Sequence, residues 1–145
     1  MKDTISAGDE QLIEQAIQEA EKNTSGEIRV HIENNCDLPV LDRATQVFAY
    51  LHMHQTKLRN GVLFYVALKS HKFAVLGDAG INVVVPPHFW QEVTNLVVAS
   101  FKEGQYAEGL KKGILMAGEQ LKTYFPYQGE EDQNELKNDV SFGQD

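Results

Sequence analysis

Carboxylate and amide side chains stand beside glycines at three places in the chain. Glu27 and Asp78 each follow a glycine, and Asn60 precedes one. Oxygen atoms of such side chains are the ligands that Ca²⁺ and Mg²⁺ take in proteins. Gly77 and Gly80 flank Asp78, and glycines let backbone groups approach a ligand closely. These five residues are therefore candidates for one hard-cation site, if the fold brings them together.

Each ligand candidate also has a purely structural interpretation, which remains open at this stage. Asp78 suits a tight turn, because aspartate side chains accept hydrogen bonds from the backbone there. Glu27 could be a solvated charge or the partner of Arg59 in an ion pair. Asn60 could be the turn residue that leads into a strand.

His54 and Arg59 are candidates for a second chemistry, phosphate-ester hydrolysis. A guanidinium binds phosphate through two parallel hydrogen bonds, and a histidine can transfer protons. A metal ion would polarise the phosphoryl oxygen and activate water. The alternatives are an ion pair of Arg59 with Glu27 or Asp78, and an ordinary surface position for His54. P-loop, EF-hand and His-Glu-x-x-His spacings are missing from the sequence.

Hydrophobic periodicity predicts the elements that position these residues. The expected helices cover about 7–22, 40–54, 89–103 and 106–124, and the expected strands cover 27–33, 61–68 and 73–76. Strict alternation over 27–33 predicts a half-buried edge strand, whereas the apolar stretch 61–68 predicts a strand covered on both faces. The order α-β-α-β-β-α-α is typical of a three-layer α/β/α sandwich on a small mixed β-sheet.

This topology predicts which residues meet. Strands 27–33 and 61–68 should run parallel, and strand 73–76 should return antiparallel as a hairpin. The candidate residues then gather at one end of the sheet, called the rim here and made up of residues 24–27, 59–61 and 77–80. The opposite end should hold ordinary loop residues, namely Cys36, Asp37, Asp42, Ser70 and Glu103.

Four sequence blocks resemble those of the TPM domain family, which includes a plant thylakoid lumen protein, a photosystem II repair protein and a nematode receptor modulator. The blocks are Thr24–Val30, Asn60–Leu63, Gly77–Ile81 and Phe101–Tyr106. The resemblance covers about residues 24–125 and implies an α/β/α sandwich. It also implies divalent-cation binding, which motif position places on Glu27, Asn60 and Asp78. One member is described as an acid phosphatase, so the resemblance also implies that activity as an alternative.

Length and composition limit the remaining classes. The chain has 145 residues, a net charge of −8 and a single cysteine, Cys36. These values predict one domain over 1–126 and exclude an intrachain disulfide scaffold. The acidity argues against a nucleic-acid partner. We see no apolar run long enough for a membrane span and no signal peptide, so a cytoplasmic monomer is expected.

Residues 127–145 carry six acidic side chains and one lysine, which predicts an acidic C-terminal tail that is extended or partly disordered. Together these observations predict a binding or regulatory module that takes Ca²⁺ or Mg²⁺ at the rim. Its expected partner is a protein or, for the alternative of a metal-dependent phosphomonoester hydrolase with low turnover, a phosphorylated small molecule.

Overall fold

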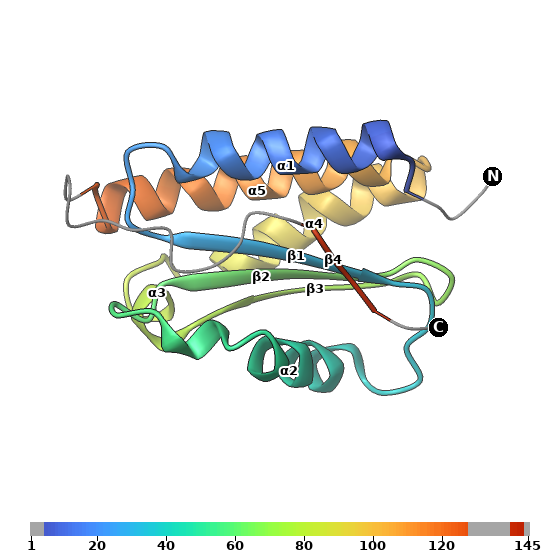
Figure 1. Ribbon diagram of the computed structural model, residues 1–145, viewed down its shortest axis with the longest axis horizontal. Helices are drawn as coiled ribbons and strands as arrows, with labels where there is room; N and C mark the ends of the chain where they lie inside the picture. The colour runs from blue at the N-terminus through green and yellow to red at the C-terminus, as the bar shows by residue number, and fades with distance from the viewer. Residues whose placement is uncertain (1–4, 128–139, 144–145) are drawn as a thin grey trace.

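The computed structural model describes residues 5–127 and 140–143. It shows a mixed sheet with helices on both faces (Figure 1). The strands lie in the order β3-β2-β1-β4. β1 runs parallel to both β2 and β4, and β3 runs antiparallel to β2. The strands are β1 (Glu27–Glu33), β2 (Gly61–Ala67), β3 (Lys72–Gly77) and β4 (Ser141–Phe142).

The helices form the outer layers of the predicted three-layer sandwich. They are α1 (Ala7–Glu21), α2 (Val40–Tyr50), η1 (Met53–Gln55), α3 (Ala79–Asn82), α4 (Phe89–Lys102) and α5 (Tyr106–Tyr124). In Figure 1, α1, α4 and α5 lie above the sheet and α2 lies below it. The predicted fold class is confirmed.

The helix predicted over 40–54 ends earlier than expected. α2 stops at Tyr50, and a single 3₁₀ turn, η1, follows His52. His52 has a φ of 57°, in the left-handed region, and a right-handed helix does not continue through such a residue.

α1 begins with a capping box and packs against α5. The Ser6 side chain accepts a hydrogen bond from the backbone of Asp9, and the Asp9 carboxylate accepts one from the backbone of Ser6. The helices approach closely because Gly118 of α5 has no side chain, and a Cβ there would lie 2.7 Å from the Ala20 Cβ. The buried face of α1 consists of Ile13, Ala16, Ile17 and Ala20.

The prediction of a half-buried edge strand over 27–33 is wrong. β1 is internal, and all seven of its residues are buried. The alternation itself is real, because Ile28, Val30 and Ile32 belong to the larger core. The polar residues between them are also buried. β4 pairs with β1, and the side chains of His31 and Glu33 have hydrogen-bond partners there. β4 was missed because a two-residue strand is too short to show a periodicity.

Most of the predicted tail, residues 127–145, lies outside the described residues. Within its described part, Val140 is buried against the larger core and the Phe142 side chain is 53% exposed. Among the helices in the described parts, none combines the length and the apolar character needed to cross a bilayer.

Candidate functional site

Backbone hydrogen bonds bring the three predicted ligands together at the rim, the left-hand end of the sheet in Figure 1. The Glu27 amide donates to the Asn60 carbonyl (3.4 Å), and the Asp78 amide donates to the Gly61 carbonyl (2.9 Å). The parallel register of β1 and β2 pairs Glu27 with Gly61. The juxtaposition therefore follows from the strand order, as the sequence predicted.

Asn60 is the deepest of the three, with 1% of its surface exposed. Its backbone amide donates to the Thr56 hydroxyl (3.3 Å), and its Nδ2 lies 3.5 Å from the Ser25 hydroxyl. Its Oδ1 is buried and has no hydrogen-bond partner among the described residues. Leaving such a carbonyl unpaired costs about 1–3 kcal/mol, which a ligand at this oxygen would offset.

Asp78 is held by an arginine and by a helix start. Its carboxylate accepts two parallel hydrogen bonds from Arg59, at 2.7 Å from Nε and 2.8 Å from a terminal nitrogen. It also accepts one from the Ala79 amide (2.7 Å), as the N-cap of α3. The pair raises the pKa of Arg59 through hydrogen bonding and charge. Of the alternatives for Arg59, the ion pair with Asp78 is thus observed.

Gly77 and Gly80 have packing roles in this structure. A Cβ at Gly80 would overlap the Leu58 carbonyl oxygen, and the Gly80 amide donates to the Arg59 carbonyl (2.7 Å). A Cβ at Gly77 would lie 2.7 Å from the Trp90 ring. Close packing alone therefore explains both glycines.

A second carboxylate near Glu27 was missed in the sequence. Glu21, the last residue of α1, accepts a hydrogen bond from the Ile28 amide (2.8 Å). Burial raises the pKa of Glu21 to about 8; the Ile28 hydrogen bond lowers it, and the neighbouring Glu27 charge raises it further. Helical periodicity could not identify Glu21, since its burial depends on how the chain turns from α1 into β1.

His54 lies in η1 and is exposed. Among the described residues, no observed hydrogen bond or ion pair joins it to Asp78. The same described residues contain no group of three His, Cys, Asp or Glu side chains that could hold a metal. A cation at the rim would therefore need amide, backbone or water oxygens in addition to carboxylates.

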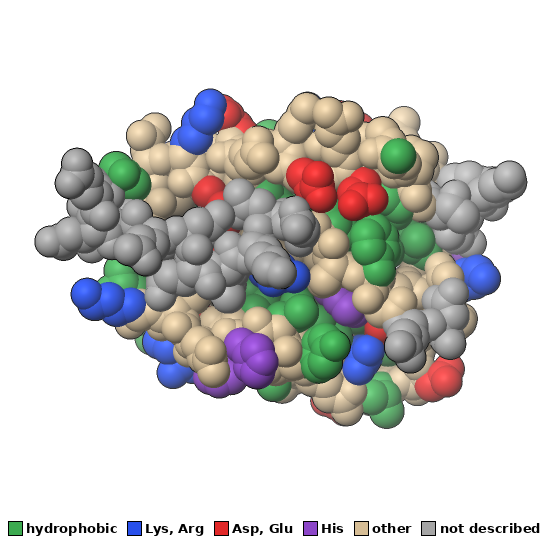
Figure 2. Space-filling view, viewed as in Figure 1, with side chains coloured by type: hydrophobic (Ala, Val, Ile, Leu, Met, Phe, Trp, Pro, Cys, Tyr) green, Lys and Arg blue, Asp and Glu red, His purple; other side chains and the backbone are tan. Residues whose placement is uncertain are grey.

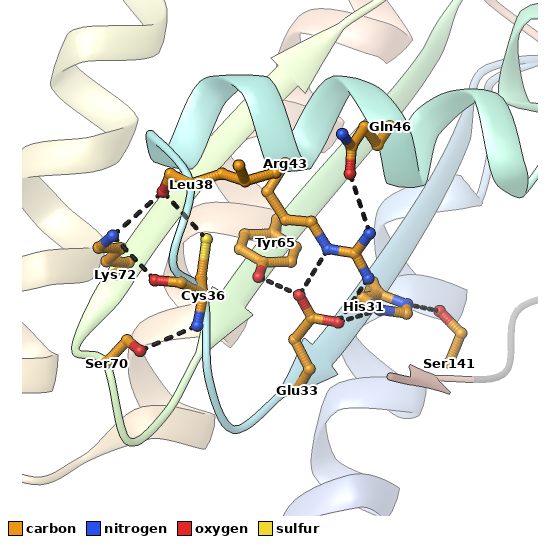
Figure 3. A network of polar contacts seen from close by, with 10 residues as sticks. All are labelled: His31, Glu33, Cys36, Leu38, Arg43, Gln46, Tyr65, Ser70, Lys72 and Ser141. Atoms are coloured by element: carbon orange, nitrogen blue, oxygen red, sulfur yellow. Dashed lines mark hydrogen bonds and ion pairs between the residues drawn. The ribbon is translucent and has the colours of Figure 1, made fainter. Parts of the chain in front are cut away.

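The opposite end of the sheet holds a buried polar network, which the sequence did not predict (Figure 3). Glu33 at the end of β1 accepts a hydrogen bond from the Tyr65 hydroxyl. It also accepts two from Arg43 of α2, at 2.8 and 2.9 Å. Burial opposes the Glu33 charge, but these hydrogen bonds prevail and lower its pKa to about 2. The polar row of β1 was the available signal in the sequence.

His31 extends this network toward β4. Its Nε2 lies 3.3 Å from a Glu33 oxygen, and its Nδ1 lies 2.8 Å from the Ser141 hydroxyl. Burial lowers the pKa of His31, although the Glu33 hydrogen bond and charge act in the opposite direction. The C-terminal segment is thereby joined to a residue 110 positions earlier in the chain.

On the face that Figure 2 shows, Lys and Arg side chains are dispersed rather than gathered into one patch. The fold and the rim together define an α/β/α domain with carboxylate and amide groups at one end of a mixed sheet. The TPM domain model matches residues 1–120. The chain belongs to the TPM domain family.

Solved structures agree with this assignment. The BA42 protein from the psychrophilic bacterium Bizionia argentinensis is 47% identical with a TM-score of 0.87, over 96% of this chain and 95% of that one. The N-terminal domain of a P. gingivalis protein is 20% identical with a TM-score of 0.68, over 83% and 78%. The N-terminal domain of cg2496 from Corynebacterium glutamicum is 12% identical with a TM-score of 0.63, over 98% and 82%. These last two show the fold alone. Among curated protein sequences, none matches the chain significantly.

Proposed function

We propose that the rim binds a divalent cation, Ca²⁺ or Mg²⁺, and that the protein acts as a cation-dependent binding or regulatory module. One observation carries the proposal: Asn60 Oδ1 is a buried oxygen with no partner among the described residues, and it lies at the strand ends that also hold Glu27 and Asp78. Hard cations take neutral amide oxygens together with carboxylates.

The carboxylates near Asn60 give the cation its charge complement. Glu27 is 2% exposed, and its charge acts on the neighbouring Glu21. Because the pKa of Glu21 is raised to about 8, its carboxyl group is largely protonated at neutral pH, and a nearby cation would favour its ionised form. Asp78 becomes a further ligand when Arg59 moves away, and the Arg59 side chain is half exposed and so free to do this.

A binding module suits this arrangement better than a hydrolase does. A cation here would tie together the junctions α1–β1, η1–β2 and β3–α3, and so order the surface that a protein partner would meet. The phosphatase alternative needs a proton-transfer group beside the cation, yet His54 is exposed and, among the described residues, no observed hydrogen bond or ion pair joins it to Asp78. We therefore advance no second function.

The test is a titration of the metal-free protein with Ca²⁺ and then Mg²⁺, followed through backbone amide signals. We expect saturable shifts at the three rim segments, 24–27, 59–61 and 77–80. Asp78→Asn should weaken binding about tenfold or more, because one ligand charge is lost. Asp42→Asn, which removes the same charge from the exposed surface of α2, should leave affinity unchanged.

Absence of saturable rim shifts in the wild type would refute the proposal. So would equal affinity in the wild type, Asp78→Asn and Glu27→Gln. A parallel assay of phosphomonoester hydrolysis by the wild type and Asp78→Asn would decide the enzymatic alternative. Its expected result is no turnover that depends on Asp78.

A further inference from the structure

The edge of β1 that faces away from β2 is occupied by a segment from the C-terminus. β4 runs parallel to β1, with His31 opposite Ser141 and Ile32 opposite Phe142. The Gly143 amide then donates to the Ile32 carbonyl (2.8 Å). Such addition of an extended segment to a sheet edge is a known mode of peptide recognition, in which the backbone supplies affinity and alternate side chains supply specificity.

Two positions of the segment select for residue size. Val140 is 6% exposed and belongs to the larger core, so this position requires an apolar side chain. At Gly143, a Cβ would overlap the Glu33 carboxylate, so a larger residue does not fit without movement. Phe142, between them, is 53% exposed, so this position places little restriction on the side chain.

The Ser141 position selects for a hydroxyl group. Its Oγ lies 2.8 Å from His31 Nδ1 and 3.2 Å from the Val30 carbonyl oxygen. Arg43 holds the Glu33 carboxylate as an acceptor, so His31 Nε2 faces it as a donor. The Ser141 hydroxyl donates its one proton to the Val30 carbonyl, and its oxygen lies within hydrogen-bond distance of His31 Nδ1. Alanine at this position would remove both the contact with buried His31 Nδ1 and the hydrogen bond to Val30.

We propose that the β1 edge is a strand-acceptor site for a protein segment of the form Val-Ser-X-Gly, and that residues 140–143 are its built-in occupant. The external partner is an extended segment of another protein with a β-branched residue, a small hydroxyl residue, any residue and glycine in sequence. It displaces the internal segment and pairs with β1 in the same parallel register. This site lies at the opposite end of the sheet from the rim, and it does not depend on cation binding there.

The test uses the full-length chain carrying Gly143→Ala, which should release the internal segment because the added methyl group overlaps Glu33. The probe is a spin-labelled peptide with the wild-type sequence of residues 138–145, and the readout is broadening of the amide signals of Val30 to Glu33. We expect the peptide to bind this variant about tenfold or more tightly than the wild type, in which the site is filled. Unshifted amide signals of α1 and α5 would show that the variant remains folded.

Matched peptides test the specificity. The Phe142→Ala peptide should bind as well as the wild-type peptide, whereas the Ser141→Ala and Gly143→Ala peptides should bind at least about tenfold more weakly. Equal binding of all four peptides, or no binding to the variant, would overturn the proposal. If the variant fails to fold, the same labelled peptides in excess over the wild-type chain give the same ranking or refute it. A dimer at the same protein concentrations would show that a second copy supplies the segment and would overturn the assignment to a separate partner.

Discussion

At the residue scale, Arg59 and a bound cation compete for the same carboxylate. Arg59 donates two hydrogen bonds to Asp78, yet its own side chain is 51% exposed. The Asp78 side chain is buried, but solvent reaches the Arg59 side chain and screens the pair, so a divalent cation can displace the arginine. The arginine then sets the affinity of the rim rather than forming part of it.

Arg59→Ala should therefore raise the affinity of the rim for Ca²⁺ by several-fold, as measured by calorimetric titration. The freed Asp78 carboxylate would become available as a ligand. Lys57→Ala removes a charge of the same sign from the same loop and controls for the general electrostatic effect. Equal affinity gains in both variants would indicate a charge effect only, and a loss of affinity in Arg59→Ala would contradict the competition.

Glu33 belongs to the same scale and predicts acid sensitivity. Its folded pKa is about 2 and its usual value is 4.5, so the unfolded chain takes up the proton first as pH falls. The contribution of the Glu33 charge is therefore complete above about pH 5 and is lost as pH falls toward about 2. This contribution is on the order of 3 kcal/mol.

Denaturant unfolding of wild type and Glu33→Gln between about pH 7 and 2 tests this, since the stability gap between them should close as pH falls. Asp37→Asn, an exposed change nearby, should follow the wild type throughout. A gap that is constant with pH would show that the folded pKa of Glu33 is not depressed.

At the scale of elements, the contact between α1 and α5 depends on Gly118, a glycine within a helix rather than in a turn. A Cβ at Gly118 would lie 2.7 Å from the Ala20 Cβ and 2.9 Å from its Cα. Gly8, in the first turn of α1, has only the Ser6 hydroxyl within reach, at 3.8 Å. The two positions therefore separate packing from helix propensity.

Gly118→Ala should destabilise the protein by about 1–3 kcal/mol through overpacking, although alanine is the better helix former. Gly8→Ala should be neutral or stabilising by up to about 1 kcal/mol. Thermal unfolding of both variants gives the comparison. Equal effects in both would mean that α1 and α5 can move apart without cost.

The elements also show which parts of the structure sequence periodicity can predict. Periodicity located the main helices and β1 to β3, and the strand order then placed Glu27, Asn60 and Asp78 at one end of the sheet. It did not find β4, which is only two residues long. It also missed Glu21 and the Arg43–Glu33 pair. Their burial comes from packing between distant segments, which local periodicity does not encode.

At the scale of the whole molecule, the central sheet couples two hydrophobic cores. The larger core includes Phe64 and the smaller one includes Tyr65, which are neighbours on β2. Neither layer of helices can lose its packing without exposing one face of the same strand. A chain of this size with one shared sheet should therefore unfold cooperatively.

The fluorescence of Trp90, the single tryptophan, provides the test. Its indole donates to the Asn82 side chain (2.8 Å), so it reports on packing next to the rim. Denaturation curves from Trp90 fluorescence and from far-UV circular dichroism should superimpose. An earlier fluorescence transition would show that the rim opens independently of the sheet.

The covalent link between α5 and β4 has a kinetic and thermodynamic consequence of its own. Pro126 is fixed at the rim by its bridge to Thr24, and Val140 is fixed beside β1. Attachment to the same chain keeps residues 140–143 at an effective concentration of about millimolar, whatever the protein concentration in solution. A separate peptide with identical contacts must exceed that value to compete. A single proteolytic cut between Pro126 and Val140 would abolish this advantage and make the segment compete on equal terms with a separate peptide.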